Sequence, residues 1–397
     1  MYLTDKQFNR TPSNKAMRGI ILLVFSAIAT ISAVAQAIVR DKTDSQPVPY
    51  ASVFSQDGDF LGNTSLTGEM PDVGSAESVR ITHVAYVARK VDVKDLSGDV
   101  FLEPSEYQLG EVVYEKPKSH CICLTGYARN YEMNRLTKDK YDIGPQESFY
   151  DGIMRVYLFL GTDKKAETQV LVARNLKTGE MKVKNMQSIG PFAGLLTNYS
   201  YIEGMRKSDV YSLRETDEGK TVISRKGADV GLIADDANDS IIHFALDFVS
   251  PDDEKNMKVL FINYRIKEQT ANAVYRKTDN NYVSQTDLMA LNARMAVMTN
   301  LFGDALLMDD FREFYVGKAE YLTKEEYKAS VRECKDMRKS GRPMMTSEQL
   351  NDYIVAHNIP AVSEEIVTKM ALVKQLQDDI RHRAEAKRAS KKKNKNN

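Results

Sequence analysis

The sequence predicts a mainly β protein with helices at its C-terminal end, an α+β fold. Short strand-like segments separated by turns fill the first third of the chain, and further β-rich segments continue to about residue 321. Beyond that point the apolar residues recur with the period of a helix. Because the chain has 397 residues, it is too long for one ordinary domain.

The composition excludes two broad classes of protein. Hydrophobic residues make up 42% and charged residues 28%, and 55 basic residues balance 55 acidic ones. A wholly disordered chain needs low hydrophobicity and a high net charge, so this chain is expected to fold. Only three cysteines are present, which excludes a disulfide-dense scaffold.

The first residues have the pattern of a secretory signal peptide. Four basic residues precede an uncharged apolar segment that starts at Gly19, and Ala33 and Ala35 form an Ala-x-Ala cleavage site. We therefore expect residues 1–35 to be removed and the mature chain to begin at Gln36. The alternative is a retained signal anchor, although this segment is short for a bilayer span and is diluted by Ser and Thr.

The charge is unevenly distributed along the mature chain. Between Lys374 and Asn397 there are nine basic and three acidic residues, so the rest of the mature chain is acidic. An acidic body does not indicate a nucleic-acid-binding domain. Residues 383–397 are expected to be disordered, and this basic tail, or an uncleaved signal, could associate with a membrane; a purely solubilising tail is the alternative.

Residues 36–117 are predicted to form a β-sandwich that folds by itself. Strand-like segments at 47–54, 60–64, 78–93, 99–104 and 110–114 alternate with turns, which is typical of a sandwich. The side chains expected to point inward are Val53, Ile81, Val91, Leu102 and Val112.

The order of short motifs in this region resembles a known family. The segments are Pro-Val-Pro-Tyr-Ala-Ser-Val at 47–53, Gly-Asn-Thr at 62–64 with Gly-Glu at 68–69, Ile-Thr-His-Val-Ala-Tyr at 81–86, and Phe-Leu-Glu-Pro at 101–104. They resemble the carboxypeptidase-like regulatory domain of Gram-negative envelope proteins. The resemblance implies a prealbumin-like sandwich without peptidase activity, in a protein of the periplasm or of the periplasmic face of the outer membrane. It departs from the family at Val39-Arg40 and at Ala85, where glycine is usual.

Residues 118–321 are expected to form one large, curved antiparallel sheet. Candidate strands cover 152–160, 166–173, 181–186, 209–214, 220–225, 240–249 and 257–267, with hairpin turns at 177–180 and 217–220. The segment 286–302 could be either a helix or a buried strand.

Residues 322–382 are predicted to be helical. Thr323 with Glu326, and Thr346 with Gln349, have the spacing of capping boxes that start two helices. A third helix is expected from Ser363.

No motif in the sequence assigns a chemistry. The five histidines (His83, His120, His243, His357 and His382) show no metal-ligand spacing beyond His382-x-x-Glu385 in the basic tail. Cys121-Ile122-Cys123, next to His120, could be a thiol site, but two small buried residues on a strand are the simpler interpretation. Cys334 is expected in the core of its helix, and the acidic segments 235–239 and 250–254 as solvated turns. We therefore assign no catalytic, cofactor-binding or metal-binding residue and no cofactor.

These observations favour a non-enzymatic exported envelope protein. The sandwich would be a docking or adaptor module, and the β-rich middle domain would bind a ligand or partner, namely an envelope protein, a lipid or a glycan, and not a nucleic acid. The alternative is a periplasmic hydrolase whose active site in the middle domain has no familiar motif.

Overall fold

The computed structural model describes most of the chain between residues 37 and 362. The described ranges are 37–96, 98–105, 111–112, 118–136, 146–161, 166–182, 210–217, 219–236, 241–247, 255–259, 262–277, 285–301, 304–340 and 343–362. The expected signal peptide, the third helix from Ser363 and the basic tail lie outside these residues.

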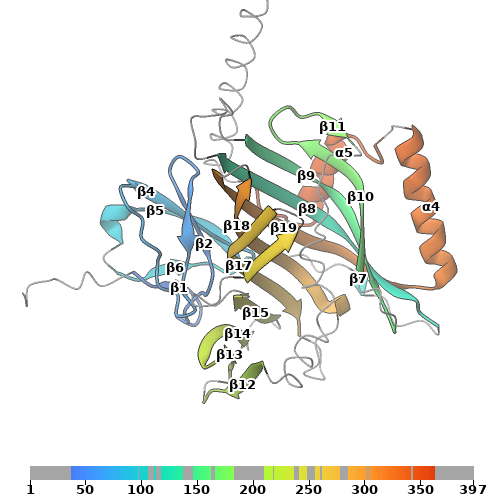
Figure 1. Ribbon diagram of the computed structural model, residues 1–397. Helices are drawn as coiled ribbons and strands as arrows, with labels where there is room; N and C mark the ends of the chain where they lie inside the picture. Colours follow the sequence, from blue (N-terminus) through green and yellow to red (C-terminus); the bar gives the residue numbers. More distant parts are fainter. Residues whose placement is uncertain are drawn as a thin grey trace, which may run out of the picture.

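The N-terminal part forms two facing sheets, as predicted for the sandwich (Figure 1). One sheet has the order β3-β2-β4-β5, and the other pairs β1 with β6 in parallel. Three of the expected inward residues, Val53, Ile81 and Leu102, are fully buried between them, and Val91 is partly buried. The bounds are β1 (Val39–Asp41), β2 (Ser52–Ser55), β3 (Phe60–Asn63), β4 (Ser78–His83), β5 (Tyr86–Asp92), the short helix η1 (Val93–Asp95) and β6 (Val100–Leu102).

The middle of the chain forms one large sheet of 13 strands. Its order is β11-β10-β9-β8-β19-β18-β17-β15-β14-β13-β12, with β16 paired to β17 and β7 to β19. The bounds are β7 (Glu111–Val112), β8 (Cys121–Leu136), β9 (Gln146–Phe159), β10 (Ala166–Asn175), β11 (Met181–Lys182), β12 (Tyr211–Glu215), β13 (Thr221–Arg225), β14 (Ala228–Asp236), β15 (Ile241–Asp247), β16 (Lys255–Val259), β17 (Ile262–Arg276), η2 (Gln285–Asp287), β18 (Leu288–Leu301) and β19 (Asp304–Leu322). All the pairs are antiparallel except β7 with β19.

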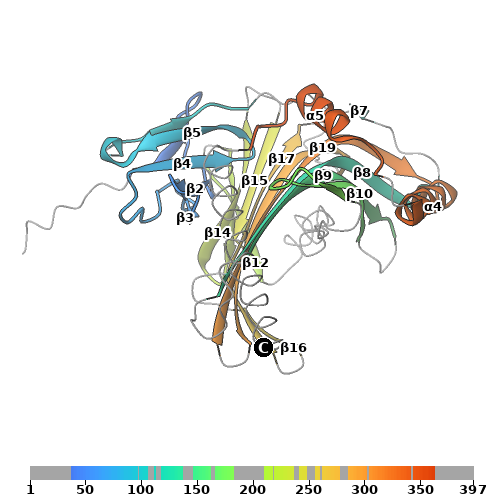
Figure 2. The same cartoon turned by 90° about the horizontal axis from the view of Figure 1, so that it is seen from above.

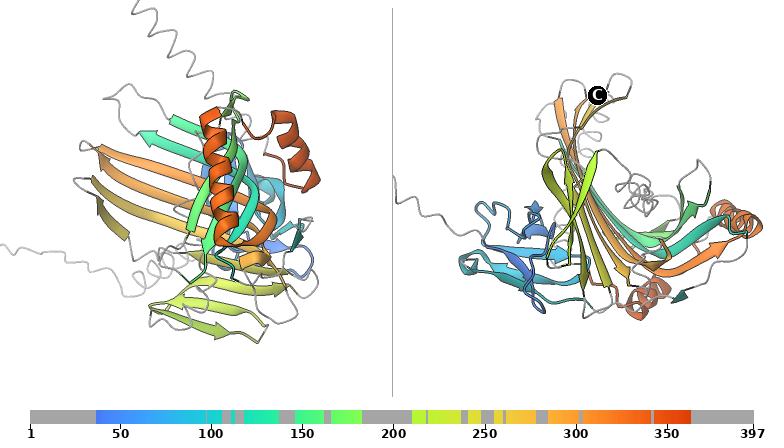
Figure 3. Two further views of the ribbon diagram at one scale, coloured as in Figure 1. Left: turned by 90° about the vertical axis from the view of Figure 1, so that its right-hand side faces the viewer. Right: turned by 90° about the horizontal axis from the view of Figure 1, so that it is seen from below.

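The sheet is strongly curved, and its two faces have different roles (Figure 2). Because side chains alternate along a strand, Leu124 and Met154 lie on one face and Tyr127 and Ile153 on the other. The sandwich and both helices pack on the convex face, which we call the outer face (Figure 3). The opposite, inner face carries an apolar cluster of buried side chains that includes Leu124, Met154, Val156, Leu246, Ala273 and Phe314.

Two helices follow the sheet at the predicted starts. For α4 (Lys324–Ser340), the Glu326 backbone N–H donates to Thr323 Oγ1 at 3.3 Å, and the Thr323 N–H donates to Glu326 Oε2 at 2.8 Å. Thr346 and Gln349 form the same reciprocal box for α5 (Ser347–Ala356). Each box satisfies two backbone donors that a helix start leaves unpaired.

A buried ion pair connects α5 to the outer face. Asp151 is completely buried and accepts from Arg174 Nη2 at 2.5 Å and from Tyr127 Oη at 2.7 Å. Arg174 Nη1 also donates to Asn351 Oδ1 at 2.7 Å and to Ser347 Oγ at 3.1 Å. Since α5 supplies both of these last oxygens, the guanidinium joins three elements.

Three details of the sequence analysis need correction or completion. Of the predicted strand 110–114, the described residues Glu111 and Val112 do not close the sandwich, and Val112 does not belong to its core. They pair in parallel with Lys318 and Ala319 of the large sheet. Residues 257–267 are not one strand but belong to the β16–β17 hairpin, whose nearly continuous apolar sequence hides the turn. The ambiguous segment 286–302 contains strand β18, since Ala290 and its neighbours pair on both sides, with β17 and β19.

Within the described part of the chain, no helix is both long enough and apolar enough to cross a membrane.

Replacing Leu102 with Ala should destabilise the sandwich by about 2–5 kcal/mol, because it leaves a cavity in a fully packed core. Urea unfolding followed by circular dichroism would measure the loss. Val87→Ala is the control, since Val87 is 51% exposed on the same small domain and should change the free energy of unfolding little. Equal effects of the two substitutions would contradict the assigned core.

Candidate functional site

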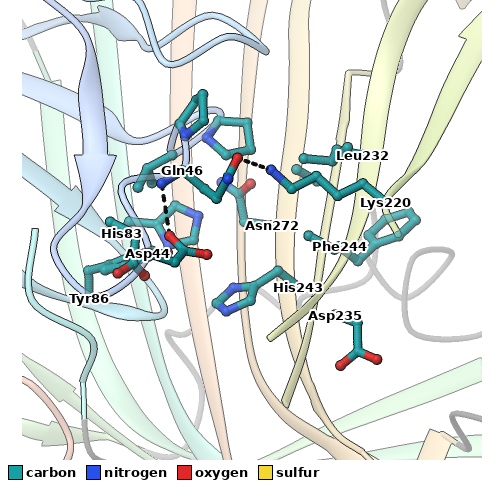
Figure 4. Close-up of a pocket in the computed structure, with 16 residues that line it drawn as sticks. Asp44, Gln46, His83, Tyr86, Lys220, Leu232, Asp235, His243, Phe244 and Asn272 are labelled. Atoms are coloured by element: carbon teal, nitrogen blue, oxygen red, sulfur yellow. Dashed lines mark hydrogen bonds between the residues drawn. The ribbon is translucent and has the colours of Figure 1, made fainter. Parts of the chain in front are cut away.

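A cleft lies where the sandwich meets the outer face of the large sheet (Figure 4). The sandwich contributes the loop 44–49 together with His83 and Tyr86 at the turn between β4 and β5. The sheet contributes Lys220 and side chains of β14, β15 and β17, among them His243 and Asn272. The cleft encloses about 580 Å³ of empty space, part of which is open to solvent.

Strand register brings the polar residues of the sheet to one place. Ala245 of β15 lies opposite both Leu232 of β14 and Asn272 of β17, and His243 comes two residues earlier. Residues two apart on a strand share a face, so His243 and Asn272 point to the same side. That side is the outer face, toward the sandwich.

Tyr50 holds the sandwich against the sheet through its hydroxyl and its carbonyl. Tyr50 Oη donates to the Val230 carbonyl at 2.9 Å, and the Tyr50 carbonyl accepts from Asn272 Nδ2 at 3.1 Å. A second contact is polar as well, because Asn63 Nδ2 donates to Glu268 Oε1 at 2.6 Å and to Thr270 Oγ1 at 3.0 Å. The loop 44–49, which precedes Tyr50, is thereby held over β14 and β15.

Asn272 is the most informative residue of the cleft. Its side chain is only 3% exposed. Nδ2 donates to the Tyr50 carbonyl and to Asn292 Oδ1 at 3.2 Å, and the amide also makes a hydrogen-bonding contact with His83. Because the Tyr50 carbonyl can only accept, the nitrogen must face it, which fixes the orientation of the amide. Asn272 therefore links the sandwich, through Tyr50 and His83, to the large sheet.

His83 lies beside Asn272 as a neutral ring. Burial, reinforced by the nearby His243, lowers the pKa of His83 to about 3. His83 Nδ1 accepts from the Ala85 backbone N–H at 3.1 Å, so the proton of the neutral ring is on Nε2. A hydrogen-bonding contact with the Asn272 side chain acts in the opposite direction and offsets part of this lowering of the pKa.

Aromatic rings continue from His83 across the junction. The Tyr86 ring meets His83 edge-on with 5.2 Å between ring centroids, and it stacks on His243 of the sheet at 6.0 Å. His83 lies in β4, within the segment 78–93 that is predicted from the sequence to be a strand of the sandwich. His243 of β15 lies in the cleft.

The charged groups of the cleft take part in hydrogen bonds and one ion pair. Lys220 Nζ donates to Gln46 Oε1, and the Gln46 backbone N–H donates to Asp44 Oδ1 at 2.8 Å. Asp235 forms an ion pair with Lys277 at 2.5 Å. Because the Gln46 amide is neutral, its bond positions the Lys220 ammonium without compensating its charge.

The cysteines lie away from the cleft and are buried. Cys121 and Cys123 are 0% and 1% exposed on β8, packed with Tyr157 and Leu322, and all three cysteines are free thiols. Burial raises the pKa of Cys121 to about 11 and that of Cys123 to about 12. Cys334 is buried on α4, as expected.

The remaining residues considered in the sequence do not converge. His120 contacts the rings of Phe159 and Tyr327, and His357 stacks on Tyr353 at 4.0 Å. His382, residues 237–240 and residues 250–254 lie outside the described residues. Among those that are described, no three His, Cys, Asp or Glu side chains form a group that could hold a metal ion.

Sequence reasoning did not single out Gln46, Tyr86 or Asn272. The one available signal was Thr270-Ala271-Asn272-Ala273, in which polar residues alternate with alanine inside a buried strand. Such an alternation shows that one face of the strand meets polar groups, but it does not identify them.

Comparisons with known proteins do not assign the chain to a family. No family model and no curated protein matches it. The lipovitellin structure titled "Lipid-protein interactions in lipovitellin" has 8% identity and a TM-score of 0.25, covering 52% of this chain and 26% of its own. DynF of the dynemicin biosynthesis pathway of Micromonospora chersina has 12% identity and a TM-score of 0.19, covering 62% of this chain and 98% of its own. Both TM-scores are too low to carry an argument.

Burial of His83 predicts loss of stability on mild acidification. The unfolded chain takes up a proton near pH 6.5, whereas the folded chain resists protonation until about pH 3. Above pH 6.5 His83 does not reduce the free energy of unfolding. Below that pH the free energy of unfolding falls, by about 2 kcal/mol at pH 5. Urea unfolding at several pH values would show the slope.

His83→Asn should flatten this slope, because the amide oxygen can accept the Ala85 N–H but does not titrate. His120→Asn serves as the control and should leave the slope as it is in the unmodified protein. If His83→Asn unfolds with the same dependence on pH as the unmodified protein, the buried ring is not its origin.

The thiols should be unreactive in the folded protein at neutral pH. Burial makes them inaccessible, and the raised pKa values of Cys121 and Cys123 keep these two thiols protonated. Labelling with a chromogenic disulfide reagent should detect no thiol before denaturation and three afterwards. The double substitution Cys121→Ser and Cys123→Ser should leave binding at the cleft unchanged. Rapid labelling in the native state, or loss of binding without loss of stability, would indicate a thiol site.

Proposed function

We propose that this chain is a non-enzymatic, exported protein of the bacterial cell envelope that binds a ligand or partner. The sandwich is the docking module, and the large sheet is the platform on which it rests. The protein is proposed to act in the periplasm or at the periplasmic face of the outer membrane, as the signal-like N-terminal sequence and the resemblance of residues 36–117 suggest. An envelope protein, a lipid or a glycan would be its partner.

The observation that carries this proposal is the cleft between sandwich and sheet. Both modules line it, and polar groups of both, among them His83, Lys220 and Asn272, converge there. Concave sites in which a few polar groups converge are typical of ligand binding. Asn272 also donates to the Tyr50 carbonyl, so a ligand in the cleft would lie beside a hydrogen bond that joins the two modules.

Three titratable groups, one in the cleft and two elsewhere on the sheet, support binding over catalysis. A ring with a pKa of about 3, like that of His83, is a weak base at neutral pH and a poor proton acceptor for a reaction. The raised pKa values of Cys121 and Cys123 likewise disfavour nucleophilic thiolates.

Export and binding can be tested together in a Gram-negative host. Intact-mass measurement of the envelope fraction should give a chain that begins at Gln36. A photo-crosslinking residue at Asp44, an exposed position of the cleft, should yield an envelope adduct, whereas the same residue at Asp72, exposed on another loop of the sandwich, should not. Cytoplasmic retention, or equal adducts from both positions, would refute the proposal.

A further inference from the structure

The exposed surface of α4 separates its charges by sign. Because a helix turns about 100° per residue, five exposed cations of α4 fall within an arc of about 80°. They form what we call the basic row, which consists of Lys324, Lys328, Arg332, Lys335 and Lys339. The row extends about 22 Å along the helix, from its first turn to its last. The exposed acidic residues of α4 lie on the next arc, and they are Glu325, Glu326, Glu333 and Asp336.

Ion pairing within the protein does not account for the basic row. Among the described residues, Lys339 is the one member within ion-pair distance of a carboxylate, that of Asp336 at 4.0 Å, and both of these side chains are largely exposed. Successive members of the row are instead three or four residues apart and carry the same charge. Such like-charge neighbours destabilise a helix slightly. The row is therefore a continuous positive surface that the described part of the chain does not neutralise.

The position of α4 leaves this surface accessible. The helix lies beside β10, at the end of the molecule opposite the sandwich (Figures 1 and 2). Its buried residue Cys334 faces the sheet, and the basic row lies on another side of the helix. A large anionic surface can therefore approach α4 without meeting the sandwich or the cleft.

The chemistry of the row favours a flat anionic surface over a linear polyanion. The single aromatic residue of α4, Tyr327, packs against Tyr157 and Phe159, so the helix has no free ring on which a base or a sugar could stack. A polyanion that wrapped around the helix would also meet the acidic arc and be repelled. A flat surface contacts the basic row alone, and anionic phospholipids attract Lys and Arg by charge without further recognition.

We infer that α4 docks the protein, through its basic row, on a membrane surface that contains anionic phospholipids. The helix lies parallel to the surface, the ammonium and guanidinium groups contact lipid phosphates, and no side chain of the row enters the hydrocarbon. The inference takes from the proposed function only its location in the envelope, and it assigns a surface separate from the cleft.

The test is vesicle flotation of the purified full chain. The protein should float with vesicles made of equal parts of phosphatidylcholine and phosphatidylglycerol, and it should not float with phosphatidylcholine alone. Raising the ionic strength from about 0.1 to 1 M should release it, because the Debye length falls from about 10 to 3 Å.

Lys328→Gln combined with Arg332→Gln should weaken vesicle binding about ten- to thirtyfold, because each cation near an anionic surface contributes roughly fivefold. Glutamine has a high helix propensity, so circular dichroism should show an unchanged helix content. The matched control is Lys90→Gln combined with Lys94→Gln, which removes two exposed cations of the sandwich and should leave the affinity unchanged.

Three outcomes would overturn the inference. Equal weakening by the two pairs of substitutions would show a general effect of net charge. Binding that survives the change at Lys328 and Arg332 would assign the attachment to the basic tail between Lys374 and Asn397, which both variants retain. Binding through the row to dextran sulfate, a linear polyanion, without binding to vesicles would identify a different class of partner.

The outcome of this test is separable from that of the proposed function. The vesicles are synthetic and the substitutions lie outside the cleft, so failure of flotation leaves the export and crosslinking results standing. Cytoplasmic retention, or equal crosslinking from both positions, would likewise leave the vesicle result unchanged.

Discussion

The contact between the Tyr50 backbone and Asn272 is the constraint on which the relation of sandwich to sheet depends. Tyr50 has a φ of 54°, in the left-handed region that residues other than glycine seldom occupy. Three hydrogen bonds offset this conformation: its N–H donates to Thr64, its carbonyl accepts from Asn272, and its hydroxyl donates to Val230. Because two of these bonds reach the large sheet, the conformation of one residue sets where the sandwich rests and which loop forms the wall of the cleft.

Polar residues on the outer face of the sheet connect it to the C-terminal helices and to the segment that follows α5. Arg129 is 4% exposed, donates to Glu313 at 3.2 Å and to the Tyr127 hydroxyl at 3.2 Å, and also reaches the Pro360 carbonyl beyond α5. A more exposed ion pair joins Arg155 of the sheet to Glu333 of α4 at 2.9 Å. A buried charge such as that of Arg129 is costly unless paired, so removing Glu313 would leave an uncompensated charge. The network therefore specifies the position of the helices more than it adds net stability.

The cleft forms where the sandwich rests on the large sheet. The sandwich is held there at Tyr50 and Asn63, and His83 and Asn272 are enclosed between the modules in hydrogen-bonding contact with each other. Buried polar groups are tolerated when they are paired in this way. The neutral state of His83 ties the stability of the junction to the pH range above 6.5.

Local patterns in the sequence determined the fold class, the inward residues Val53, Ile81 and Leu102, and the starts of both helices, because alternation, turn residues and capping boxes act over a few neighbouring residues. The same patterns could not place Glu111 and Val112 in the large sheet, nor find the β16–β17 turn, because strand pairing is decided by partners distant in the chain. The site could not be predicted from the sequence for the same reason. His83 and Asn272 are 189 positions apart in the chain. Only the register of β15 with β17 and the contact of the sandwich with the sheet at Tyr50 bring them together.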